Sequence, residues 1–185
     1  MGKRRLFLAV NLPEHAKTLI EKALARWRNL PIHWIAARNI HVTLVFIGYA
    51  TDEEMLEIAK VARDVAARHK PFSFTLSRLI LAPPGKAKRM VWWEGEASHE
   101  LENLFRDLQD GLAAGELLPK METRPYHPHI TIGRIRIQEW RRLAEKPEID
   151  EPLSATVPVD SFELMESDLK RGGTEYSILE SFPLR

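Results

Sequence analysis

The chain has 185 residues, of which 44% are apolar and 29% charged, and its formal net charge at pH 7 is +1. These values are typical of a globular chain that forms one domain of ordinary size, and the near-neutral charge means that any basic binding site must be local. The sequence has no cysteine, which excludes disulfides, thiolate nucleophiles and cysteine-ligated zinc.

The first ten residues begin like a signal peptide, with three cations before an apolar run. The run stops at Asn11 and Pro13, so it is too short for a signal peptide or a membrane span. Gly2 also lacks the Ser or Thr four residues later that N-myristoylation requires. We therefore predict a first strand here, in a cytoplasmic protein without membrane association.

The hydrophobic pattern predicts alternating strands and helices along the chain. After a strand over 6–10, Pro13 opens a helix that extends to about residue 30 and ends at Pro31. Thr51 is the expected N-cap of a second helix ending near residue 69, because three acids follow it. We further expect strands over 33–35, 41–48, 72–81, 90–94, 129–132, 156–159, 161–166 and 175–181, and helices over 98–112 and 138–145.

Many of these strands are short and joined by hairpin-like turns. This pattern favours an α+β fold with antiparallel sheets and helices packed outside them. A helix followed by a His-x-Thr strand occurs early in the chain and again later. We therefore predict two similar lobes around a central cleft, with one His-x-Thr strand in each lobe.

The two motifs are His41-Val-Thr43-Leu and His129-Ile-Thr131-Ile. Residues i and i+2 of a strand point to the same face, so each histidine should project together with its threonine. Strict alternation also predicts that Phe46 points to the opposite face of its strand, together with the apolar second and fourth residues of the first motif.

Histidine can accept or donate a proton near neutral pH, since its ordinary pKa is about 6.5. Two histidines on facing strands therefore suit an in-line displacement at phosphorus, in which one deprotonates the nucleophile and the other protonates the departing oxygen. The hydroxyls of Thr43 and Thr131, with a nearby cation, can hold the non-bridging phosphate oxygens. We expect no metal or other cofactor for this chemistry.

A zinc site is the main alternative, because His127 and His129 have the His-x-His spacing found in such sites. A third ligand would have to come from His41, Asp150 or Asp160, and no carboxylate lies near either motif in the sequence. We therefore prefer the paired acid–base site and interpret His127 as an auxiliary polar residue at the edge of the cleft.

Basic and aromatic residues outside the motifs are weaker candidates for RNA binding. The turn over 82–89 carries three cations that, with Lys170 and Arg171, could form a local basic rim. Trp34, Trp92 and Trp93 are more typical of a core, although one aromatic near the cleft could stack on a base. The three cations of the turn are Lys86, Lys88 and Arg89.

The sequence resembles the two-histidine phosphoesterase superfamily. Within it, the chain is similar to the RNA 2′,3′-cyclic phosphodiesterases, historically called 2′-5′ RNA ligases (the LigT family). The resemblance covers nearly the whole chain and includes residues 5–10, Trp34, residues 39–48, residues 126–134 and residues 162–176. The duplicated motif is typical of the superfamily, and Gly48 and Arg134 after the two motifs are typical of this family.

The resemblance implies one two-lobed phosphoesterase domain over 1–185 that hydrolyses a terminal 2′,3′-cyclic phosphate on RNA to a 2′-phosphate. It also implies a second activity that joins RNA ends through a 2′-5′ linkage. By position, His41 would donate a proton to the leaving group, His129 would activate water, Thr43 and Thr131 would hold phosphate oxygens, and Arg134 would add a positive charge. The expected partners are RNA ends, including tRNA fragments, with no obligate protein partner.

Other functions remain open at this point. The same residues would suit an RNA-end binding module with little turnover, or a phosphodiesterase for small cyclic nucleotides or 2′-5′ oligonucleotides.

The position of Arg134 also needs explanation, because strict alternation puts it on the face opposite His129. A bulge or twist at Gly133 would bring it round.

Overall fold

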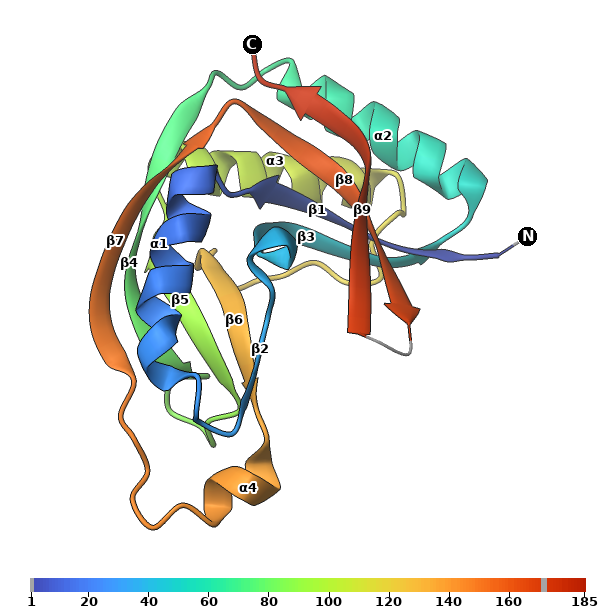
Figure 1. Ribbon diagram of the computed structural model, residues 1–185. Helices are drawn as coiled ribbons and strands as arrows, with labels where there is room; N and C mark the ends of the chain where they lie inside the picture. The colour runs from blue at the N-terminus through green and yellow to red at the C-terminus, as the bar shows by residue number, and fades with distance from the viewer. Residues whose placement is uncertain (1, 171–172) are drawn as a thin grey trace.

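The computed structural model describes residues 2–170 and 173–185, and it contains two antiparallel sheets with helices packed against them (Figure 1). This arrangement confirms the predicted α+β class. The first sheet has the strand order β3-β1-β8-β9 and the second the order β2-β6-β5-β4-β7. The strands are β1 (Arg4–Asn11), β2 (Ile32–Trp34), β3 (His41–Ala50), β4 (Phe72–Ala82), β5 (Met90–Glu96), β6 (His129–Ile135), β7 (Asp150–Val159), β8 (Ser161–Lys170) and β9 (Gly173–Pro183).

The helices lie on the outside of the two sheets. Helices α2 and α3 pack against each other and contact β3, and α2 also contacts β9, so both cover the first sheet. Helix α1 contacts β7 of the second sheet, and α4 lies at the end of the molecule opposite α2 (Figure 1). The helices are α1 (Glu14–Leu24), α2 (Asp52–Ala66), α3 (His99–Ala114) and α4 (Ile137–Arg141), with 3₁₀ turns η1 (Ala25–Trp27) and η2 (Ala37–Asn39).

Helix α2 begins at the predicted N-cap. The Thr51 hydroxyl accepts a hydrogen bond from the Glu54 backbone N–H at 3.2 Å, and the Glu54 carboxylate accepts one from the Thr51 N–H at 2.7 Å. This reciprocal pair satisfies two backbone donors that the helix itself leaves unpaired, which is worth about 1 kcal/mol. The acids of the first turn therefore define where α2 starts.

The buried side chains of both sheets form one continuous core. It includes Leu8 and Val42 from the first sheet and Val91 and Ile130 from the second. Trp93 is fully buried among them, and its indole N–H donates to the backbone carbonyl of Leu153 at 2.9 Å. Because the sheets share this core, the relative position of β3 and β6 is fixed by packing.

Several predicted boundaries were wrong by a few residues. Helix α1 ends at Leu24 and continues only as the η1 turn, because the chain then turns into β2, which pairs with β6. Helix α2 ends at Ala66 and α4 at Arg141, each earlier than predicted. Strand β7 begins at Asp150 because residues 150–155 already pair with β4.

Candidate active site

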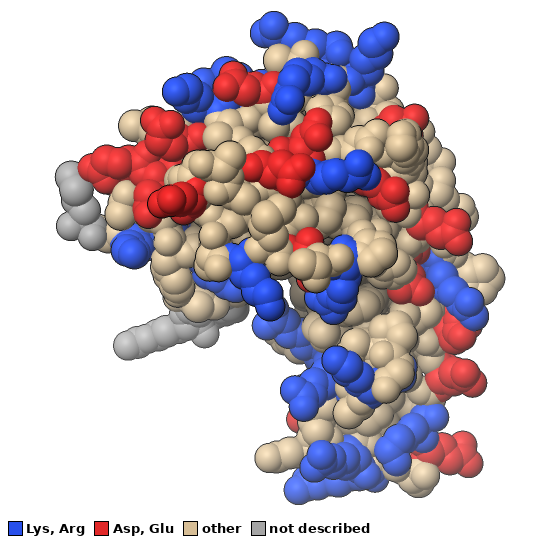
Figure 2. Space-filling view, turned by 180° about the vertical axis from the view of Figure 1, so that it is seen from behind, with Lys and Arg blue, Asp and Glu red and all other residues tan. Residues whose placement is uncertain are grey.

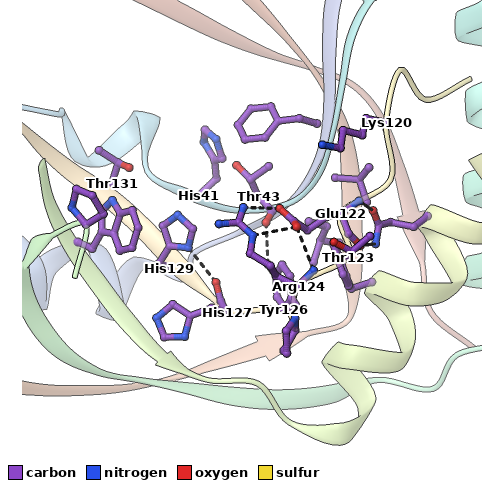
Figure 3. Close-up of a pocket in the computed structure, with 18 of the residues that line it drawn as sticks. His41, Thr43, Lys120, Glu122, Thr123, Arg124, Tyr126, His127, His129 and Thr131 are labelled. Atoms are coloured by element: carbon purple, nitrogen blue, oxygen red, sulfur yellow. Dashed lines mark hydrogen bonds and ion pairs between the residues drawn. The ribbon is translucent and has the colours of Figure 1, made fainter. Parts of the chain in front are cut away.

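The two His-x-Thr motifs occupy the first residues of β3 and β6, one in each sheet. Both histidines and both threonines line a single cleft of about 1080 Å³ (Figure 3). The residue between the histidine and the threonine of each motif, Val42 or Ile130, is buried in the core. The alternation of each strand thus gives its apolar residue to the core and its His and Thr to the cleft.

Each of the two imidazoles is oriented by a hydrogen bond between its Nδ1 and a backbone carbonyl. The Nδ1 of His41 lies 3.0 Å from the carbonyl oxygen of Asn39, and the Nδ1 of His129 lies 2.9 Å from that of His127. A carbonyl can only accept, so each Nδ1 carries the proton and each neutral ring has its lone pair on Nε2. In both motifs, therefore, Nε2 is the nitrogen that can accept a proton or, when charged, donate one.

His41 lies under aromatic rings of the first sheet. Its ring centroid is 4.8 Å from that of Phe7 and 4.9 Å from that of Tyr176, which approaches edge-on from β9. Burial lowers the pKa of His41 to about 4, against the opposing effect of the hydrogen bond to Asn39. The free enzyme therefore holds this imidazole in its neutral form at pH 7.

His129 is partly covered by an indole ring and has ionisable neighbours. Its ring lies 4.1 Å from Trp92, centroid to centroid, and 6.1 Å from His127. The Nε2 of His127 is 2.7 Å from the carboxylate of Glu94, which is paired across the strands with His129. Burial lowers the pKa of His129, and the charge of His127 lowers it further while Glu94 opposes that shift.

A β-bulge at the last residue of each motif changes which residues face the cleft. In β3, Leu8 pairs with Val45 and Ala9 with Thr43, so Leu44 is the extra residue. In β6 the extra residue is Ile132, in the same position of the motif.

The bulges bring the residue five positions after each histidine into the cleft, where Phe46 and Arg134 are both exposed. The prediction that Phe46 lies on the opposite face was therefore wrong, because a bulge reverses the alternation. Phe46 is 65% exposed, and its ring lies 6.0 Å from that of Phe7.

Gly133 allows β2 to pack closely over the bulge of β6. A Cβ atom at this position would lie 2.7 Å from a methyl carbon of Ile32 and 2.8 Å from the indole of Trp34. These distances are shorter than van der Waals contact, so a larger residue would push β2 away. The sequence predicted a bulge or twist at Gly133; the bulge lies one residue earlier, at Ile132, and Arg134 lies at the cleft.

A loop between α3 and β6 forms one wall of the cleft and connects the two motifs. The Tyr126 hydroxyl donates to the backbone carbonyl of Thr43 at 2.7 Å, and its ring stacks on Phe105 with a centroid distance of 4.5 Å (Figure 3). The side-chain amide of buried Gln109 in α3 accepts a hydrogen bond from the Glu122 backbone N–H at 2.7 Å and donates one to the Glu122 carbonyl at 3.2 Å. The segment that leads into the second motif is thus fixed to the first.

Only some of the residues that line the cleft could be predicted from the sequence. Of the three tryptophans, Trp93 is core, Trp34 packs on the core, and Trp92 lines the cleft beside His129. Tyr176 and Phe46 had no recognisable signal, since one depends on the position of β9 and the other on a bulge. Of the predicted basic rim, Lys86 lines the cleft, whereas Arg171 and the side chain of Lys170 lie outside what the structure describes.

The residues considered for a zinc site are separated. Asp150 pairs with Arg78, with 2.8 Å between its Oδ2 and Nη2 of the arginine, and His127 pairs with Glu94. Within residues 2–170 and 173–185, no three His, Asp or Glu side chains are grouped closely enough to bind a metal ion. Among these residues there is also no helix with the length and apolar composition needed to cross a membrane.

Comparison with known proteins identifies the family. An RNA 2′,3′-cyclic phosphodiesterase from Thermus thermophilus is 33% identical, covering 98% of this chain and 90% of that protein. The crystal structure of TT0787 from the same organism matches with a TM-score of 0.81 and 28% identity over 98% of both chains. E. coli LigT complexed with 3′-AMP matches with a TM-score of 0.77 and 27% identity, again over 98% of both chains. The model of the 2′-5′ RNA ligase superfamily matches residues 13–171, and the chain therefore belongs to this superfamily.

Proposed function

We propose that this chain hydrolyses the 2′,3′-cyclic phosphate at the end of an RNA to a 2′-phosphate, by acid–base catalysis with His41 and His129 and without a metal ion. The named activity of its relatives supports the proposal. The observation that carries it is the matched orientation of the two imidazoles, each held through Nδ1 with Nε2 left for proton transfer, in one cleft.

In the reaction, Nε2 of neutral His129 takes a proton from water as the water oxygen attacks phosphorus. The bond between phosphorus and the 3′-oxygen breaks, and Nε2 of charged His41 gives its proton to that oxygen. The products are a 2′-phosphate and a 3′-hydroxyl, and solvent restores both protonation states. Because burial favours neutral His41 in the free enzyme, the phosphate anion must charge it on binding, as an adjacent negative charge raises the pKa of an imidazole.

The remaining cleft residues would bind the phosphate and the nucleoside. Thr43, Thr131 and exposed Arg134 line the same cleft; the two hydroxyls would donate to the non-bridging oxygens and the arginine would add a positive charge. Donors of this kind are worth about 10²–10³-fold each in rate when they meet charge that develops in the transition state. Phe46 is the aromatic best exposed for stacking on a base.

We infer that the partners are RNA ends, with tRNA fragments among the candidates, and that the protein meets them in the cytoplasm. Joining of such an end to a 5′-hydroxyl would use the same residues, with the hydroxyl in place of water.

The test is turnover of an RNA oligonucleotide that ends in a 2′,3′-cyclic phosphate, measured in excess EDTA. The variants His41→Ala and His129→Ala should each lose about 10²–10⁴-fold in kcat. His99→Ala is the matched control, because His99 is exposed in the first turn of α3, outside the cleft, and this variant should keep full activity. Near-wild-type turnover in either site variant, or complete loss in EDTA that zinc restores, would refute the mechanism.

A further inference from the structure

The chain carries a strongly basic surface beside the cleft, although its overall charge is near zero. The turn over 83–89 has three cations and no acid, and the segment over 134–142 has four arginines and one acid, Glu139. These sixteen residues therefore hold a formal charge of +6, whereas the whole chain holds +1. All other residues together carry a net negative charge, so these two segments account for the excess of positive charge.

The two segments lie side by side in the fold. Strand β5 starts at the end of the turn, and its first residue, Met90, pairs with Arg134. The backbone N–H of Ile135 donates to the carbonyl of Arg89 at 2.9 Å. The two segments therefore adjoin each other, and we call their exposed part, with its seven cations, the basic surface (residues 83–89 and 134–142).

The basic surface is continuous with the cleft. Lys86 from the turn and Arg134 from β6 both line the cleft beside the second motif. From Arg134 the surface continues along α4 to Arg141 and the adjoining Arg142. Figure 2 shows Lys and Arg around the hollow of this face and again at the lower end of the molecule.

The positive charges on this surface are largely uncompensated. All seven side chains are exposed. Of these seven, only Arg136 forms an ion pair with any residue that the structure describes, at 3.2 Å from Glu139. Like charges that repel one another destabilise a fold slightly, so an uncompensated cluster next to an active site is best explained by a polyanionic ligand.

We propose that the basic surface binds the backbone phosphates of the RNA strand that leads into the cleft, so that the preferred substrate is an oligonucleotide and not a cyclic mononucleotide. This inference rests on the proposed function and adds to it the part of the substrate that lies beyond the reacting nucleotide. The phosphate charge of that strand, and not its sequence, is what the arginines recognise.

The test compares two substrates in the double variant Arg141→Ala/Arg142→Ala. The substrates are a nucleoside 2′,3′-cyclic monophosphate and an RNA of about ten nucleotides with the same end. The logarithm of the binding constant falls linearly with the logarithm of the salt concentration. Each lost phosphate contact makes this slope less steep by about 0.7 for a single strand. Two lost contacts lower it by about 1.4, which at 0.1 M salt corresponds to a roughly 10–25-fold fall in kcat/KM for the oligonucleotide. Turnover of the mononucleotide should not change.

The matched control is Arg68→Ala/Lys70→Ala, which removes two charges just beyond α2, at the other end of the molecule (Figure 1). It should leave both substrates and the salt slope unchanged. An unchanged salt slope in the Arg141/Arg142 variant, or an equal loss with both substrates, overturns the proposal.

If the wild type hydrolyses neither substrate, the proposed function fails. In that case, fluorescence anisotropy measures the binding of a 5′-labelled RNA with a 2′-phosphate end. The salt dependence of this binding, compared between the same variants, then tests the basic surface.

Discussion

The protonation of His41 can be changed by removing one aromatic ring. Tyr176 covers the imidazole edge-on from β9, and the variant Tyr176→Ala would open that side to water. Burial is the main cause that holds the pKa of His41 at about 4, so the variant should raise this pKa toward the ordinary 6.5. The full difference corresponds to about 3 kcal/mol between the two protonation states, at ~1.4 kcal/mol per pH unit.

The sign of the stability effect follows from proton binding. Between pH 6.5 and about 4, the unfolded chain binds a proton at His41 that the folded chain excludes. The free energy of unfolding therefore falls as the pH falls through this range, by up to about 3 kcal/mol from this group, and the contribution is constant above pH 6.5. Tyr176→Ala should show a smaller fall over the same range.

The measurement is an NMR titration of the histidine ring nitrogens between pH 3 and 8. His41 should titrate near pH 4 in the wild type and closer to pH 6.5 in Tyr176→Ala. Tyr49→Ala, which removes an exposed tyrosine of the same sheet, is the control and should leave the titration unchanged. A wild-type His41 that titrates at pH 6.5, or a Tyr176→Ala variant that still titrates near pH 4, would refute the reasoning.

The same shift predicts the pH dependence of catalysis. In the proposed mechanism, turnover needs one charged and one neutral imidazole, and kcat/KM reports the free enzyme. Both histidines have lowered pKa values. Above pH 6.5 the charged fraction thus falls tenfold per pH unit, and kcat/KM should fall with it. Because bound phosphate raises the pKa of His41, the alkaline limb of kcat should lie at higher pH. A kcat/KM that rises between pH 6.5 and 8 would contradict paired-histidine catalysis with these pKa shifts.

Three further predictions concern the surroundings of the site. Tyr126→Phe removes the hydrogen bond that ties the segment before the second motif to Thr43 of the first; it should lower the free energy of unfolding by about 1 kcal/mol in urea denaturation and reduce kcat more than it changes KM. Gly133→Ala forces a methyl group against β2; it should destabilise the fold by about 1–3 kcal/mol and lower kcat, and an unchanged denaturation midpoint would disprove the packing argument. His127→Ala should raise the pKa of His129 and Glu94→Gln should lower it in the same NMR titration, and shifts of equal sign would exclude the electrostatic explanation.

The sequence by itself was sufficient to predict the fold class and the residues of the two motifs. The repeated His-x-Thr pattern in two strands identified the four motif residues, because alternation is a local property of an extended chain. The start of α2 was equally predictable, since the capping pair of Thr51 and Glu54 is only three residues apart. What these features share is that neighbouring residues in the chain are sufficient to produce them.

Tertiary structure alone decided how the cleft is completed. The bulges that turn Phe46 and Arg134 into it arise from pairing with other strands, and a one-residue change of register reverses every side chain beyond it. Tyr176 reaches His41 across 135 residues of sequence, and its ring contributes to the burial that lowers the pKa of that imidazole. Burial and register depend on contacts between distant segments, so no local pattern could have shown them.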